Sequence, residues 1–210
     1  FKNSKLLITI RDPRANLKSG IVNWVAYDST RENQSHFYLY IKRIREDLRF
    51  ANKLKNEKLF IKLEEAGELN TKKEISQFLG INFCPEMMKA TYAGKIWPGD
   101  KLSKFYAKDG EYNKSVINNG WENFFTKKDK IILNFIYRDY KKFGYKIDNI
   151  NWINKLLIIF YIPLPFSFEK KYFNIKNYFK RKNSIKEKTS DIYNYIKRII
   201  YLYLLLLKLY

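Results

Sequence analysis

The sequence predicts an α/β fold with parallel strands, followed by a C-terminal helical appendage. Two short apolar segments, 5–10 and 58–63, have the length and composition of buried strands. Apolar residues at helical spacing occur in the connection between the two strands. A long helical connection of this kind is typical of parallel strands. We therefore expect an α/β domain over residues 1–148 and a basic, apolar helical appendage over residues 149–210.

The first strand runs directly into a helix that we expect over residues 13–27. Arg11 follows the strand, Asp12 stands where an N-cap belongs, and Pro13 occupies the first helical position, where its missing N–H costs nothing. An arginine beside a helix N-terminus is typical of anion sites, because backbone N–H groups and the positive end of the helix dipole face the anion. Ser19, two turns further on, can add a hydroxyl donor.

The next segments continue the alternation of helices and strands. Apolar residues at helical spacing predict a long helix over residues 32–54. This helix contains His36, the only histidine, which lies away from any motif and which we interpret as an ordinary helix residue. A helix over 71–79 follows the second strand and ends in Phe78-Leu79-Gly80, two apolar residues for a core face and a glycine C-cap.

Residues 82–120 lack a regular period, and irregular segments of this length on an α/β scaffold are commonly functional. Trp97 is the most distinctive residue there, either as a functional contact or as a packing anchor. Thr126 predicts the N-cap of a last domain helix over 127–143, with Asp129 as a weaker form of the capping-box acid. The apolar face of that helix comprises Ile131, Ile132, Phe135, Ile136 and Tyr140.

The start of the chain resembles the PAPS-dependent sulfotransferases. In that family a strand ends in Arg, often within Arg-Asp-Pro-Arg, and a Ser follows eight residues after the first Arg; Arg11 and Ser19 have that spacing. The family also has a strand ending in Tyr-Glu-Asp-Leu and a short helix ending in Phe-Leu-Gly. This chain keeps Glu64 and Phe78-Leu79-Gly80 but has Leu63 and Ala66 where the family often has Tyr and Leu.

A third segment resembles the family's basic loop, which precedes a Gly-Trp step and closes over the nucleotide. Gly120 and Trp121 match the step, and Lys114 and Ser115 fall where the loop has its phosphate-contacting residues, although the Arg-Lys-Gly form of the loop is absent. Trp121 is open to a second interpretation, as a core aromatic residue. The resemblance covers roughly residues 5–145.

The resemblance implies an incomplete three-layer P-loop-NTPase-like sulfotransferase fold and the transfer of a sulfuryl group from PAPS to an acceptor hydroxyl or amine. It implies that Arg11 and Ser19 hold the 3′-phosphate of PAPS and that Lys114, Ser115, Gly120 and Trp121 contact the same nucleotide. Trp97 would then lie on the side of the unidentified acceptor. No metal is implied.

The loop that cradles the phosphosulfate in this family, Pro-Lys-Ser-Gly-Thr or Gly-x-x-Arg-Ser-Gly-Thr, does not occur in this sequence, and neither does a P-loop. The chain begins at Phe1. We therefore expect it to be the C-terminal part of a longer sulfotransferase, with the phosphosulfate loop and the catalytic residues upstream of Phe1. The 210 residues alone would then be inactive.

The composition bounds the possible partners. The formal net charge of +20 suits an anionic ligand or surface. No RNP, zinc or helix-turn-helix signature points to a specific nucleic acid. Cys84 is the only cysteine, which excludes an internal disulfide and a cysteine-based metal site and permits a reducing compartment. We expect a cytoplasmic protein, with membrane association as the alternative.

Residues 151–210 carry 12 basic and three acidic side chains around two apolar runs, 156–166 and 199–207. Both runs are shorter than the ~20 apolar residues that a membrane-spanning helix needs. Either the appendage packs its apolar side on the domain or on another copy, or it is a tail that binds a membrane surface or a partner. The alternative to a sulfotransferase function is that the whole chain is a non-catalytic basic protein that binds a membrane surface or a partner.

Overall fold

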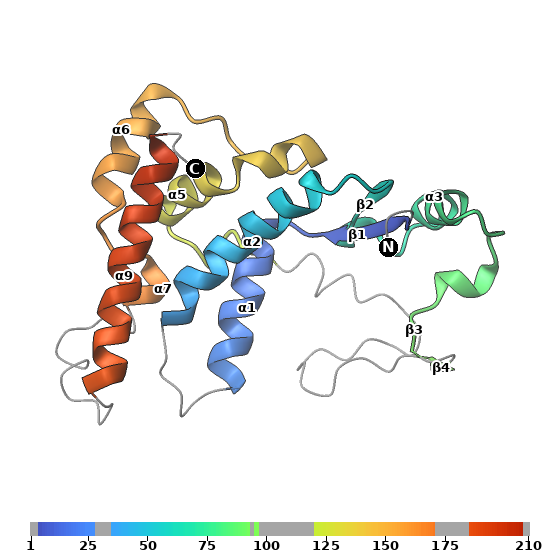
Figure 1. The fold of residues 1–210 in the computed structure, drawn as a ribbon, viewed down its shortest axis with the longest axis horizontal. Helices are drawn as coiled ribbons and strands as arrows, with labels where there is room; N and C mark the ends of the chain where they lie inside the picture. The colour runs from blue at the N-terminus through green and yellow to red at the C-terminus, as the bar shows by residue number, and fades with distance from the viewer. Residues whose placement is uncertain (1–3, 28–34, 93–94, 97–119, 171–184, 208–210) are drawn as a thin grey trace. The chain divides into compact units, whose positions relative to one another are not determined.

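The computed structural model describes residues 4–27, 35–92, 95–96, 120–170 and 185–207. Within these residues the protein is mixed α/β and mostly helical (Figure 1). The chain divides into two compact units. Unit 1 holds residues 1–11 and 51–119, and unit 2 holds residues 12–50 and 120–210.

The sheet of unit 1 confirms the prediction of parallel strands. β1 (Leu6–Ile10) pairs in parallel with β2 (Lys58–Lys62), and the register places Ile8 opposite Phe60. A second, antiparallel pair joins β3 (Thr91–Tyr92) to β4 (Lys95–Ile96). The parallel pair requires the long connection that the sequence provides, because two parallel strands cannot be joined by a tight turn.

The helix of unit 1, α3 (Leu69–Leu79), ends as predicted at a glycine C-cap. Gly80 has a φ of 73°, a left-handed conformation that favours glycine, and the amide of Ile81 donates to the carbonyl of Ser76 at 3.0 Å. The prediction that Leu79 faces the core is wrong, because its side chain is 41 % exposed. The buried stripe of α3 stops before its last turn and comprises Thr71, Ile75 and Ser76.

In unit 2, α1 (Pro13–Tyr27) packs closely against α2 (Ser35–Lys53). A Cβ atom on Gly20 would lie 2.2 Å from the ring of Tyr40, and the Tyr40 hydroxyl donates to Asn16 Oδ1 at 3.0 Å. The absence of a side chain at Gly20 therefore permits this approach. The predicted apolar face of α2 is buried at Ile41, Ile44, Leu48 and Ala51.

The segment 127–143, predicted as one helix, has two parts. α5 (Lys127–Ile136) has Tyr137 as its C-cap, and a 3-10 segment, η3 (Arg138–Phe143), follows it. The amide of Tyr140 donates to the carbonyl of Tyr137 at 2.9 Å, which tightens the backbone at this point. Both tyrosine side chains are thereby buried.

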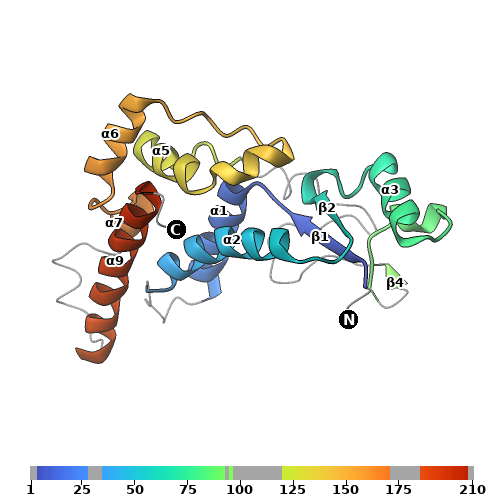
Figure 2. The same cartoon turned by 45° about the horizontal axis from the view of Figure 1, so that its top comes forward.

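The C-terminal residues form α6 (Trp152–Tyr161), α7 (Ser167–Lys170) and α9 (Ile185–Leu206). α6 and α9 lie side by side in Figures 1 and 2, and the Tyr203 hydroxyl donates to the carbonyl of Ile159 at 3.0 Å. The predicted boundary between 148 and 149 falls inside unit 2. Among the described residues, no helix combines the length and apolarity needed to cross a bilayer. The C-terminal side chains buried in unit 2 include Ile158, Ile162, Phe166, Leu202 and Leu205.

Buried tyrosines connect α2 to η3 and α9. The Tyr140 hydroxyl donates to the carbonyl of Ile44 at 2.8 Å, and the Tyr137 hydroxyl donates to that of Ile41 at 3.3 Å. Tyr201 of α9 packs edge-on against Tyr38 of α2, with 5.9 Å between the ring centroids. Burial raises the pKa of Tyr137 and of Tyr140 well above the usual value for tyrosine and raises that of Tyr201 to about 12.

These shifts predict that the protein loses stability above a pH of about 10, the pKa of an unfolded tyrosine. Above that pH the folded state binds more protons than the unfolded state, so the free energy of unfolding falls as the pH rises. Tyr140→Phe should remove one tyrosine with a raised pKa. The decrease in the free energy of unfolding with pH should then be smaller by about 1.4 kcal/mol per pH unit. At neutral pH the same change should cost about 0.5–1.5 kcal/mol for the lost hydrogen bond.

Urea unfolding at neutral and at alkaline pH measures both effects. Tyr193→Phe is the matched control, because Tyr193 lies on α9 and is exposed. An alkaline slope that is the same in Tyr140→Phe and in the wild type would contradict the prediction.

Candidate functional site

The start of α1 confirms the predicted cap. Asp12 Oδ1 accepts the amide of Arg14 at 2.9 Å, and the Asp12 carbonyl accepts the amide of Asn16 at 2.9 Å. β1 ends at Ile10, so two residues separate the strand from the helix. The carboxylate of Asp12 already interacts with the positive end of α1, and the helix end therefore offers an external anion fewer donors than the sequence suggests.

The Arg14 side chain is used inside unit 2. It is 2 % exposed and binds Asp12 through two parallel contacts, Nε to Oδ1 at 3.0 Å and Nη2 to Oδ2 at 2.7 Å. Its Nη1 donates to Asn134 Oδ1 at 3.0 Å, and Asn134 Nδ2 donates to Asp148 Oδ2 at 2.9 Å. The second arginine of the Arg-Asp-Pro-Arg motif is therefore a structural group that joins α1 to α5.

The Gly120-Trp121 step lies against α1. The Trp121 ring stacks on the guanidinium of Arg14, with 3.8 Å between the ring centroid and Cζ. Lys18 Nζ donates to the carbonyl of Gly120 at 2.7 Å. Unit 2 thus brings the Gly120-Trp121 step next to α1, the helix that carries Ser19. Gly120 and Lys18 are 102 positions apart in the sequence.

Arg11 and Ser19 are both half-buried. Arg11 follows β1 in unit 1 and already interacts with other residues, whereas Ser19 lies in α1 in unit 2. A guanidinium and a hydroxyl are both donors, which suits a phosphate.

Three of the predicted site residues, Trp97, Lys114 and Ser115, lie outside the described residues. His36 lies in α2, as predicted. Within the described ranges, no group of three or more His, Cys, Asp or Glu side chains could hold a metal ion.

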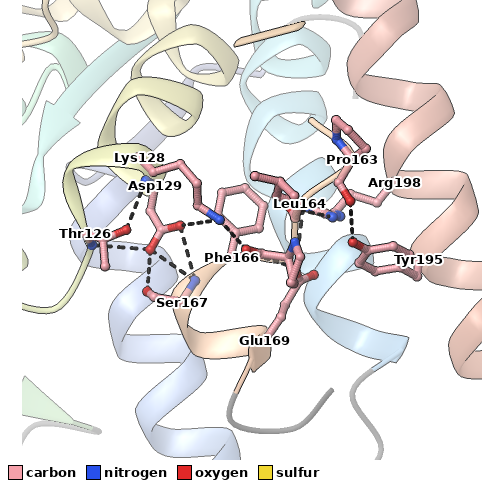
Figure 3. A network of polar contacts seen from close by, with 11 residues as sticks. Thr126, Lys128, Asp129, Pro163, Leu164, Phe166, Ser167, Glu169, Tyr195 and Arg198 are labelled. Carbon is pink, nitrogen blue, oxygen red and sulfur yellow. Dashed lines mark hydrogen bonds and ion pairs between the residues drawn. The ribbon is translucent and has the colours of Figure 1, made fainter. Parts of the chain in front are cut away.

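A second polar cluster in unit 2, the α5–α9 network, connects the C-terminal helices to α5 (Figure 3). The predicted capping box of Thr126 and Asp129 is confirmed, and Asp129 also accepts the amide of Ser167 at 3.2 Å and its hydroxyl. Lys128 Nζ donates to the carbonyl of Pro165. The carboxylate of Asp129 thus joins the start of α5 to the start of α7.

Glu169 and Arg198 form the other half of this network. Glu169 Oε2 accepts the amide of Phe166 at 2.8 Å and lies 3.4 Å from Arg198 Nη1. Arg198 Nη2 donates to the carbonyl of Leu164 at 3.2 Å. Burial raises the pKa of Glu169, against the opposing effect of Arg198, and burial lowers the pKa of Lys128. Glu169 and Arg198 are buried and bind each other, which indicates an anchor for α7 and α9.

Sequence reasoning missed Arg14, Asn134 and Lys18 as members of the candidate site. The pairing of Asp12 with Arg14 could have been predicted from the sequence, because an acidic and a basic residue stand two positions apart at the start of a predicted helix. The contact of Arg14 with Asn134 could not, because the two residues are 120 positions apart.

Comparisons with protein-family models, with curated proteins and with solved structures found no match for this chain.

Arg14→Ala should destabilise the protein by about 3–5 kcal/mol, because it leaves Asp12 and Asn134 without their shared partner inside unit 2. Arg43→Ala is the matched control. Arg43 forms an ion pair with Asp47 on α2 at 3.5 Å, but both side chains are exposed, so its loss should cost at most about 1 kcal/mol. Urea unfolding monitored by circular dichroism compares the two variants, and equal losses would contradict a structural role for Arg14.

Proposed function

We propose that this chain is a sulfotransferase-type protein that binds PAPS through its 3′-phosphate and serves the transfer of a sulfuryl group to an acceptor hydroxyl or amine. The observation that supports the proposal best is the contact of the Gly120-Trp121 step with α1 through Lys18 and Arg14. Two motifs that the resemblance associates with the same nucleotide therefore meet on one helix.

Arg11 and Ser19 are proposed to hold the 3′-phosphate. The guanidinium of Arg11 provides charge-assisted hydrogen bonds, and the hydroxyl of Ser19 provides a neutral one. Asp12 would repel an incoming phosphate if it were unpaired, but Arg14 neutralises it at 2.7 Å. The ion pair with Arg14 therefore reduces the repulsion between the Asp12 carboxylate and the phosphate.

The 3′-phosphate lies far from the reacting bond, so these residues would contribute binding and orientation. In the transfer step, the bond between sulfur and the bridging oxygen breaks, the acceptor oxygen or nitrogen bonds to sulfur, and the acceptor proton passes to a base. Negative charge grows on the departing 5′-phosphate, where positioned donors stabilise it. We assign no residue of this chain to that step.

The finer fold in this proposal is an incomplete three-layer P-loop-NTPase-like sulfotransferase fold. The parallel pairing of β1 with β2, and the helix that follows β1 after two residues, support it. Trp121 stacks on Arg14, which gives it a positioning role for the Gly120-Trp121 step. Lys114 and Ser115 are proposed as further contacts to the nucleotide, and Trp97 as a contact on the acceptor side.

Arg11→Ala should weaken the binding of adenosine 3′,5′-bisphosphate by about 1.5–3 kcal/mol, the range for a hydrogen bond to a charged group. Isothermal titration calorimetry measures the affinity. Adenosine 5′-monophosphate is the matched ligand, because it lacks the 3′-phosphate and its affinity should not change in Arg11→Ala.

Arg43→Ala is the control variant, since it removes an arginine from the exposed surface of α2. An affinity for the bisphosphate that is the same in Arg11→Ala and in the wild type would refute the role of Arg11. An equal loss for both nucleotides would place Arg11 elsewhere on the ligand.

Ser19→Ala should weaken the binding of adenosine 3′,5′-bisphosphate by a smaller amount, about 0.5–1.5 kcal/mol, because it removes a neutral donor. Ser190→Ala, at an exposed position of α9, provides the control in the same titration. A Ser19→Ala variant with the wild-type affinity would exclude the hydroxyl from the phosphate site.

A further inference from the structure

One side of α6 is apolar and exposed. Trp152 and Phe160 are each 70 % exposed, which is unusual for aromatic side chains in a folded protein. Five exposed residues of α6 recur at helical spacing and share one side of the helix. This surface, the α6 face, comprises Trp152, Ile153, Leu156, Ile159 and Phe160.

The opposite side of α6 is already occupied. Ile158 and Ile162 are fully buried in unit 2, and the carbonyl of Ile159 accepts the hydroxyl of Tyr203 from α9. The helix is therefore held in place by one side. Among the residues of unit 2 that the structure describes, none covers the exposed aromatic side chains of the other side.

A cationic groove lies at the edge of the α6 face. Its volume is about 350 Å³, and Arg138, Lys141 and Lys155 line it together with apolar residues such as Phe135. Asp148 is its one carboxylate, and that group accepts a hydrogen bond from Asn134. Lys155 belongs to α6 itself, between two residues of the α6 face. Apolar and cationic groups thus adjoin on one surface.

We propose that the α6 face binds the interface of an anionic lipid bilayer. Trp152 and Phe160 would enter the boundary between headgroups and acyl chains, and the three cations of the groove would face the lipid phosphates. A helix of 10 residues spans about 15 Å, half of the hydrocarbon core, so α6 would lie in the interface.

Charge favours a lipid surface over a second copy of the chain. The net charge of the chain is +20, and residues 151–210 carry 12 basic and three acidic side chains. Pairing two α6 faces would bring cations against cations, whereas an anionic bilayer carries the opposite charge. The apolar character of the α6 face disfavours a nucleic acid as its partner. A nucleic acid is bound mainly through its phosphates by cations, so the five apolar side chains of the face would stay in water.

Co-sedimentation of the full chain with vesicles tests the proposal. We expect binding to vesicles of phosphatidylcholine mixed with phosphatidylglycerol, and weak binding to vesicles of phosphatidylcholine alone. The double variant Trp152→Ser/Phe160→Ser should bind the anionic vesicles at least about tenfold more weakly, because it removes the two largest apolar groups of the face.

Phe50→Ser is the matched control, because Phe50 is 66 % exposed but lies on α2, away from the α6 face in the sequence. It should keep the wild-type affinity for vesicles. Circular dichroism of all variants verifies that they fold, which is expected because each substituted side chain is exposed. Arg138→Gln/Lys155→Gln should reduce binding to the anionic vesicles and leave the weak binding to phosphatidylcholine unchanged.

Any of four results would overturn the proposal. The wild type could fail to bind anionic vesicles, or Trp152→Ser/Phe160→Ser could bind them like the wild type. Sedimentation velocity could show self-association that the double variant abolishes, which would assign the face to a second copy. Equal binding of single-stranded RNA and vesicles, lost only in Arg138→Gln/Lys155→Gln, would assign the surface to polyanions in general.

Discussion

The ion pair between Asp12 and the buried Arg14 is the contact on which the start of α1 depends. A carboxylate and a guanidinium inside a protein are stable only when hydrogen bonds replace the water that they lose. Here the two groups bind each other twice, Asp12 also caps the helix, and Arg14 also binds Asn134. The same guanidinium supports the ring of Trp121. One charge pair therefore joins α1, α5 and the Gly120-Trp121 step.

The remaining order of unit 2 depends on α2 and on the α5–α9 network. The buried hydroxyls of Tyr137 and Tyr140 donate to main-chain carbonyls of α2, which requires that both hydroxyls stay protonated. At the other end, Asp129 and Glu169 cap backbone amides that would otherwise be buried without partners. Because Asp129 accepts from Ser167 and Glu169 pairs with Arg198, these contacts join segments far apart in the sequence and hold the C-terminal helices in unit 2.

The two proposals concern different residues of the chain and depend on different physical interactions. Nucleotide binding at Arg11 and Ser19 is a matter of directed, charge-assisted hydrogen bonds. Lipid binding by the α6 face is a matter of apolar area, with a contribution from nearby cations. A high positive charge favours both. The residues are distinct, so either proposal can fail while the other stands.

The sequence by itself determined the features that depend on neighbouring residues. The cap at Asp12, the capping box at Thr126 and the glycine C-cap at Gly80 all follow from residues within one or two turns. The parallel pairing of the strands follows from the length of the connection between them. Tertiary structure alone decided the burial of Arg14 and the break after Ile136, because both depend on partners about 100 positions away. Tertiary structure also decided which apolar helix faces are buried by other elements. Periodicity shows that a helix has an apolar side, but only packing leaves the α6 face exposed.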